Sequence, residues 1–179
     1  MANTKLTDLP EIASPVLADI IYLVDDPGGT PVSNKITLGD LIALPVGQVY
    51  TAGGTGSQTP GTSYVLLTQI DSDGLSYGGI TPDSANNKIT VTNTGLYAVF
   101  MQCSFSGTNN SSVEMTIFWN GVEQSQVHFL RKIGTSGDAG SASTLGLVDV
   151  TTGSTDLDIR VKTGGASDDV DVESLQFLV

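Results

Sequence analysis

Basic residues are scarce in this 179-residue chain. It carries 7 Lys and Arg against 19 Asp and Glu, which gives a formal net charge of −12 and a sequence pI of about 4.1. Nucleic-acid binding requires clustered Lys and Arg, and here only Arg131 and Lys132 are adjacent. The composition therefore excludes a nucleic-acid-binding protein and predicts no nucleic-acid partner.

Cysteine and histidine are each limited to one residue. Cys103 alone forms neither an internal disulfide nor a multi-thiolate metal site, and its apolar surroundings predict a buried, inert thiol. His128 lies in a strand-like run, where a structural or interface histidine is favoured over a catalytic one. No Gly-x-Ser-x-Gly motif surrounds any serine. We therefore expect no enzymatic activity and no cofactor.

Long apolar runs are also missing. No segment approaches the ~20 apolar residues that a membrane helix needs, so no membrane partner is expected. The N-terminus lacks a basic start followed by an apolar core, so no signal peptide is predicted. We expect the chain to fold in the cytoplasm of the cell that makes it.

Strand-forming patterns dominate what is present. Gly is abundant at 21 residues, and Ser, Thr and Asn recur between short apolar runs. Alternation is clean in 156–162, with Leu157, Ile159 and Val161 on one side. Asn120-Gly121 between two apolar runs predicts a hairpin, and a change of apolar parity near Ser174 predicts a bulge. About seven to nine strands with turns every ~8–12 residues predict an all-β sandwich or jelly roll.

The chain divides into three predicted parts. Residues 1–45 form a small N-terminal arm, with a strand at 20–24, a Pro-Gly-Gly turn, a returning strand and a short helix near 38–44. Residues 46–62 are predicted to be a linker rich in Gly, Ser and Thr. Residues 63–179 are predicted to form the jelly roll. The arm is too small for its own core, so we expect it to dock on another protein.

The segment from Ile89 to Val113 contains no charged residue. A central strand with one apolar face and one uncharged face is covered either by its own chain or by a symmetry mate. We favour an oligomer interface. The candidates for core or trimer interface, between which parity does not decide, are Tyr97, Val99, Phe100, Phe118 and Trp119.

One acidic cluster is a candidate metal site. Alternation would place Asp169, Asp171 and Glu173 on one face, where three carboxylates suit a hard cation. A solvated edge that resists edge-to-edge pairing is the favoured interpretation. The loop from Asp71 is similar to a calcium loop, but its glycine comes too early and no glutamate follows at the required spacing.

Residues 60–179 resemble the jelly-roll superfamily of complement C1q and tumour necrosis factor. Gly95 and Tyr97 match the glycine and tyrosine that enter a central strand of that family, Asn120-Gly121 matches its hairpin, and residues 172–179 lie where its closing strand ends. The resemblance implies a C1q/TNF-like jelly roll that forms a tight homotrimer. We accordingly expect residues 46–179 to remain trimeric without the arm.

Residues 4–44 resemble the short N-terminal module of many tailed-phage virion proteins. Leu9-Pro10, Asp19, Val24-Asp25 and Asp40-Leu41 fit its pattern. The resemblance implies a phage virion structural protein, and the lack of a shaft favours a trimeric capsid decoration or cement protein on the capsid surface. Its partner would be the major capsid protein. The candidate capsid-docking residues are Ile20, Ile21, Tyr22, Leu23, Ile36, Leu38, Leu41 and Ile42.

Two other functions have less support in the sequence. A tail-fibre or receptor-binding tip would recognise a host surface ligand through its loops, yet Tyr50 and Tyr77 are the only loop tyrosines expected. A glycan hydrolase or esterase on the same scaffold is disfavoured, because no nucleophile or paired-carboxylate motif is recognisable.

Overall fold

The structure is a computed structural model that describes residues 20–25, 32–37, 44–54, 56–135 and 137–179. The chain forms two compact units, Met1–Leu44 and Pro45–Val179. In the first unit, β1 (Ile20–Asp25) and β2 (Val32–Thr37) pair as an antiparallel hairpin, with Ile20 opposite Thr37 and Asp25 opposite Val32. The helix expected near 38–44 falls almost entirely outside the described residues.

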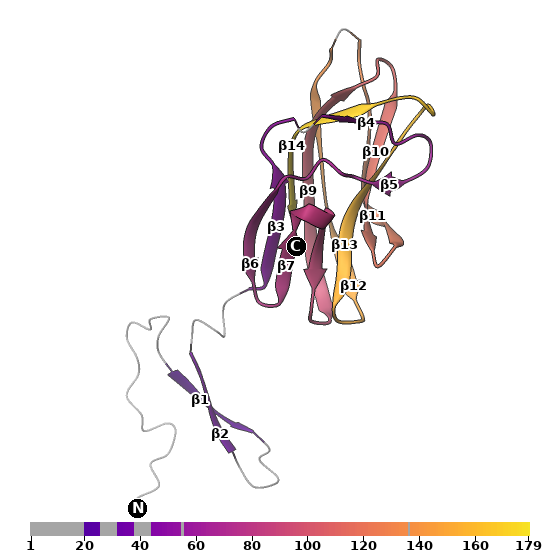
Figure 1. Ribbon diagram of the computed structural model, residues 1–179. Coiled ribbons are helices and arrows are strands. Elements are labelled where there is room, and N and C mark those ends of the chain that lie inside the picture. Colours follow the sequence, from indigo (N-terminus) through magenta and orange to yellow (C-terminus); the bar gives the residue numbers. More distant parts are fainter. Residues whose placement is uncertain (1–19, 26–31, 38–43, 55, 136) are drawn as a thin grey trace, which may run out of the picture. The chain divides into compact units, whose positions relative to one another are not determined.

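The second unit contains two six-stranded antiparallel sheets (Figure 1). The first sheet has the order β12-β9-β14-β3-β6, with β4 beside β14. Its strands are β3 (Val46–Thr51), β4 (Ser57–Gln58), β6 (Ser72–Tyr77), β9 (Gly95–Gly107), β12 (Gly140–Val150) and β14 (Val170–Leu178).

The second sheet has the order β11-β10-β13-β8-β7, with β5 beside β13. Its strands are β5 (Val65–Leu66), β7 (Ile80–Asp83), β8 (Lys88–Val91), β10 (Ser112–Trp119), β11 (Val122–Lys132) and β13 (Thr155–Thr163). A 3-10 turn, η2 (Ser84–Asn86), connects β7 and β8. The described residues contain no α-helix, and no helix among them is long and apolar enough to cross a membrane.

The core lies between the two sheets and follows the period of two along each strand. In β13, every second residue is buried, including Leu157, Ile159 and Val161, as the alternation predicts. In β9, Val99, Met101, Cys103 and Phe105 are fully buried. Burial raises the pKa of the Cys103 thiol to about 12, which agrees with the predicted inert thiol.

Two local predictions are confirmed. Asn120 and Gly121 both have positive φ, 48° and 79°, and join β10 to β11 with Trp119 opposite Val122. This left-handed pair is the backbone that a two-residue hairpin requires. The register between β14 and β9 shifts between Val172 and Ser174, which is the predicted bulge.

The predicted linker 46–62 differs from the structure. Val46–Thr51 is β3, an interior strand of the first sheet, and Ser57–Gln58 is β4. Val49 and Thr51 are buried, while the alternate positions are partly exposed. This alternation spans only six residues beside a Gly-rich stretch, so pairing with β14, rather than local composition, determines the strand.

Candidate functional site

The first sheet presents an uncharged face on the side away from the core. It is formed by the residues that alternate with the buried ones on four neighbouring strands. These residues are Leu145, Leu147, Ala98, Phe100, Gln102, Gln176, Leu178, Gln48 and Tyr50, and none of them is charged. We call this set the uncharged face. Charged side chains begin at its ends, with Asp149 on β12 and Glu173 on β14.

Large apolar side chains on this face are exposed to solvent in the single chain. Leu145 is 67% exposed and Leu147 55%, and Leu96, just beyond the face on β9, is 66% exposed. Phe100 is partly buried, and it lies opposite Leu145 on one neighbouring strand and Leu178 on the other. A contiguous apolar row across three strands is typical of an interaction surface rather than of scattered surface residues.

A depression interrupts the uncharged face beside this apolar row. Its volume is about 360 Å³. The lining combines aromatic, amide and hydroxyl groups from β3, β9 and β14, and consists of Tyr50, Thr51, Ala52, Gln102, Ser174, Leu175 and Gln176. The face is thus not flat, and its projecting leucines and its depression lie on different strands.

The five candidates for core or trimer interface separate in the structure. Val99 is fully buried in the core, and Tyr97 and Trp119 are partly buried and pack against it. Trp119 Nε1 donates to the Thr155 hydroxyl at 2.8 Å. Phe100 alone lies on the uncharged face. Phe118 is buried on the outer side of the second sheet.

The segment just before β5, which no sequence motif marks, covers Phe118. The Tyr64 ring packs edge-on against Phe118 with centroids 5.6 Å apart, and the Arg160 guanidinium lies 4.2 Å from the Phe118 centroid. The Tyr64 hydroxyl donates to Glu114, which also pairs with Lys162 at 3.1 Å. The residues just before β5 therefore close the outer face of the second sheet with an aromatic and ionic cluster.

The electrostatics of this cluster follow from its contacts. Burial acts to raise the pKa of Glu114, but hydrogen bonds from Tyr64 and Lys162 outweigh it and hold that pKa below its usual value. Burial and the neighbouring Glu114 carboxylate raise the pKa of the Tyr64 hydroxyl well above its usual range. The Tyr64 hydroxyl is therefore a stable hydrogen-bond donor at neutral pH.

The three carboxylates of the candidate metal site do not form a ligand cluster. Asp169 accepts a hydrogen bond from the Thr108 hydroxyl, and Glu173, at the bulge, accepts one from Ser106 at 3.2 Å. Within the described ranges, no group of three or more His, Cys, Asp or Glu side chains is arranged to hold a metal ion. The predicted alternation itself is present, because Val170 and Val172 are buried while Asp169, Asp171 and Glu173 are not, and it breaks only after Glu173, where Ser174 is also exposed.

The candidate capsid-docking residues lie in the first unit. Ile20, Ile21, Tyr22 and Leu23 belong to β1, and Ile36 belongs to β2. Leu38, Leu41 and Ile42 lie outside the described residues.

Comparison with known proteins supports the fold. No protein-family model and no curated protein matches the chain. Among solved structures, Eiger TNF from S. frugiperda is similar, with 15% identity and a TM-score of 0.51, covering 76% of this chain and 92% of that one. Murine APRIL at pH 8.5 has 12% identity and a TM-score of 0.47, covering 74% and 98%. With its two antiparallel sheets, residues 45–179 form a jelly roll of the tumour necrosis factor type, as the sequence resemblance predicted.

Proposed function

We propose that this chain is a non-enzymatic virion structural protein of a tailed phage, which forms homotrimers and decorates the capsid. The observation that carries the proposal is the uncharged face, on which Leu145 and Leu147 are more than half exposed within their own chain. The occupant of this face is a second copy of the chain. The resemblance of residues 60–179 to a trimeric superfamily supports the same assembly.

The chemistry of the face suits burial against another copy. Glutamine amides, a tyrosine hydroxyl and apolar side chains can be desolvated without leaving an unpaired charge. Covering the exposed part of Leu145 or Leu147 contributes about 1–2 kcal/mol of favourable transfer free energy, because each leucine is already partly covered by its own chain. A specific interface buries about 800 Å² on each partner, which is the area that the proposed contact must reach.

Leu145 and Leu147 lie on β12, whereas the depression is lined from β3, β9 and β14. A contact of these leucines with the depression of another copy fits a head-to-tail ring. It fits a two-fold dimer equally, because each of two copies can present both features at once. The resemblance to a trimeric superfamily is therefore the support for three copies.

The first unit supplies the proposed attachment to the major capsid protein. A hairpin of two six-residue strands is at best marginally stable in water on its own. Docking of β1 and β2 on capsid subunits would bury their apolar residues and hold neighbouring subunits together. The resemblance of residues 4–44 to virion-attachment modules supports this role.

Electron microscopy of particles with and without the protein tests the proposal. We expect trimeric density at many positions on the head, and capsids that resist heat or chaotrope less well without it. A few copies confined to the tail, with adsorption blocked when they are masked, would instead assign a receptor-binding tip. Absence from the particle would refute the virion role altogether.

A further inference from the structure

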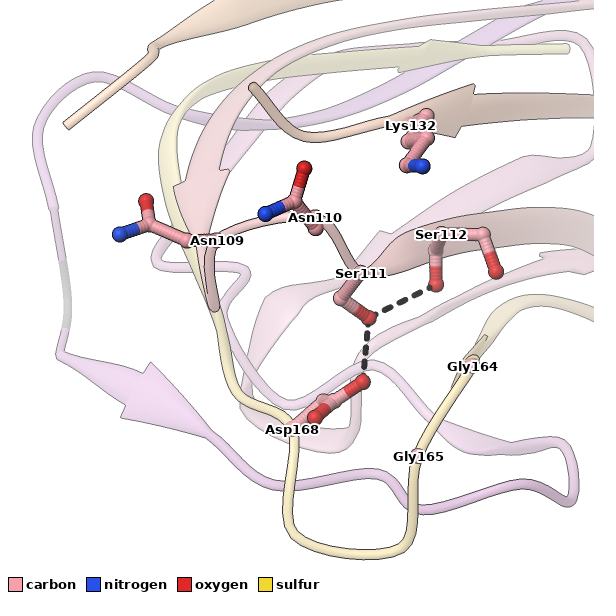
Figure 2. A pocket seen from close by; sticks show the side chains of 8 residues that line it. All are labelled: Asn109, Asn110, Ser111, Ser112, Lys132, Gly164, Gly165 and Asp168. Atoms are coloured by element: carbon pink, nitrogen blue, oxygen red, sulfur yellow. Dashed lines mark hydrogen bonds between the residues drawn. The ribbon is translucent and has the colours of Figure 1, made fainter. Parts of the chain in front are cut away.

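A second pocket lies at one end of the jelly roll, where three loops meet (Figure 2). Its volume is about 410 Å³, within the range of roughly 300–1,000 Å³ that is usual for small-molecule sites. The β9–β10 connection and the start of β10 contribute Asn109, Asn110, Ser111 and Ser112. The end of β11 contributes Lys132, and the β13–β14 loop contributes Asp168 and two glycines.

Hydrogen bonds connect the three segments that line the pocket. The Asn110 N–H donates to the Gly134 carbonyl at 3.3 Å, and the Gly164 N–H donates to the Ser112 carbonyl at 2.9 Å. The Ser111 hydroxyl, which is only 6% exposed, donates to Asp168 Oδ2 at 2.5 Å. A ligand would therefore meet walls that are already ordered, which lowers the entropic cost of binding.

The two glycines keep polar atoms accessible. A Cβ added at Gly165 would lie 2.8 Å from both carboxylate oxygens of Asp168, and one at Gly164 would lie 2.8 Å from the Ser112 hydroxyl. Neither glycine has the left-handed backbone that favours this residue type. Space beside Asp168 and Ser112, rather than backbone strain, is what a side chain at these positions would remove.

Few of the polar groups that line the pocket form hydrogen bonds with one another. Figure 2 shows two side-chain hydrogen bonds among the lining residues, and both are made by the Ser111 hydroxyl. In the described part of the chain, the four ion pairs use Lys88, Arg131, Arg160 and Lys162. The Lys132 ammonium, the Ser112 hydroxyl and the Asn109 and Asn110 amides thus remain available to a ligand.

The lining selects a class of ligand by chemistry. It has no apolar or aromatic side chain, which disfavours apolar ligands. Asp168 and the net charge of −12 disfavour anions, and Lys132 disfavours cations. Lys132 donates hydrogen bonds, Asp168 accepts them, and the serine hydroxyls and asparagine amides do both. This combination suits the hydroxyl groups of a ligand, which also donate and accept.

We propose that this pocket binds a neutral saccharide residue, with Asp168 and Lys132 each contacting hydroxyl groups of the sugar. The site goes beyond the proposed function and does not depend on it. An open pocket with few contacts predicts weak binding by one protomer, with a dissociation constant of roughly 1 mM. Several copies on one assembly would strengthen the attachment to a glycan surface.

The test is a titration of the isotope-labelled full chain with methyl glycosides of glucose, galactose and mannose, followed by NMR of the backbone amides. We expect at least one of them to shift amides of residues 109–112 and 164–168 in a saturable way. Gly165→Ala, which fills the space beside the carboxylate, should abolish these shifts. Asp168→Asn and Lys132→Ala should each weaken binding about tenfold, the usual loss for a hydrogen bond to a charged group.

Matched variants and ligands make the test decisive. Gly53→Ala adds a methyl group with nothing within 4 Å, and Asp71→Asn removes an exposed carboxylate elsewhere; both should bind as the unmodified chain does. Glucuronic acid and glucosamine carry one charge of either sign on the glucose ring and should bind more weakly than a neutral glycoside. Three results would each overturn the proposal: no saturable shift with any neutral glycoside at about 10 mM, an unchanged response in Gly165→Ala, or equal binding of a charged sugar.

Discussion

Gln69 satisfies the backbone at the bulge of β14. Its side-chain Nε2 donates to the Val170 carbonyl at 2.9 Å, and its Oε1 accepts from the Val172 N–H at 2.5 Å. Its own carbonyl accepts from the Thr51 hydroxyl. At 3% exposure, the side chain supplies hydrogen bonds to β14 where its pairing with β4, at 170–171, ends and its pairing with β3, at 175–178, has not begun.

Gln69→Leu tests this role, because it keeps the approximate volume and removes both side-chain hydrogen bonds. We expect a loss of about 2–4 kcal/mol in the free energy of unfolding, since two buried backbone groups lose their partners. Urea unfolding of both proteins measures it. Gln126→Leu, on an exposed amide, serves as the control, and a Gln69→Leu midpoint as high as that of this control would show that water satisfies the bulge.

Glu114 makes a pH-dependent contribution to stability. Its pKa in the folded chain is lowered by Tyr64 and Lys162. A carboxyl whose folded pKa lies below its unfolded value of about 4.3 stabilises the fold above that value, and the stabilisation disappears as pH falls through the folded pKa. The ionised Glu114 therefore stabilises the fold at neutral pH and not in strong acid.

Glu114→Gln should accordingly lower the thermal midpoint at pH 7 and leave a smaller difference from the unmodified chain at about pH 3. Thermal unfolding at both pH values provides the measurement. Asp156→Asn should behave alike, because hydrogen bonds from Lys88 and Thr90 outweigh burial and lower the pKa of Asp156. A difference that does not change with pH would contradict the assignment.

At the scale of elements, β3 shows how one strand depends on its neighbours. Gly47 is buried, and a Cβ there would lie 2.2 Å from Ile80 Cγ2. The glycine thus permits close contact between β3 and β7, which belong to different sheets. The sequence alone predicts that this glycine belongs to a flexible linker, because Ile80, against which it packs, is 33 residues away.

Leu145→Lys tests the uncharged face. The leucine is largely exposed within its own chain, so the substitution should leave the thermal stability of a protomer nearly unchanged. Placed in the proposed interface, an unpaired ammonium group should convert the trimer to monomers. Light scattering and sedimentation of the full chain measure the mass.

Leu130→Lys is the matched control for that substitution. Leu130 is 61% exposed on β11, in the other sheet, and this variant should remain trimeric. Equal masses for the two variants, or a monomeric unmodified chain, would contradict the assignment of the interface.

At the scale of the molecule, the two units predict separable roles. The fragment 45–179 retains every strand of both sheets, including β3, which a cut after residue 62 would remove. We expect the fragment to be trimeric in light scattering and to unfold with the same urea midpoint as the full chain. It should not bind capsids, because the proposed attachment lies in residues 1–44. A monomeric fragment beside a trimeric full chain would place the trimer contacts in the first unit instead.

The sequence predicted those features that depend on neighbours along the chain. Alternation in β13, the Asn120-Gly121 hairpin and the parity change in β14 each follow from a few consecutive residues, and the sandwich follows from their repetition. The resemblance around Gly95 and Tyr97 correctly predicted the type of jelly roll. Local patterns carry this information because strand period and turn conformation are set by adjacent residues.

Features that join distant residues were determined by the tertiary structure alone. It brought β3 into an interior position and placed Phe118 under Tyr64. It also separated Phe100 from Val99 and Trp119. The pocket lined by Ser111, Lys132 and Asp168 was likewise assembled from three separate segments of the chain. Alternation predicts that a strand has two different faces. Only the packing of one sheet on another determines which face lies in the core and which is exposed. A sequence with period two specifies both faces equally, and the burial that distinguishes them comes from residues tens of positions away.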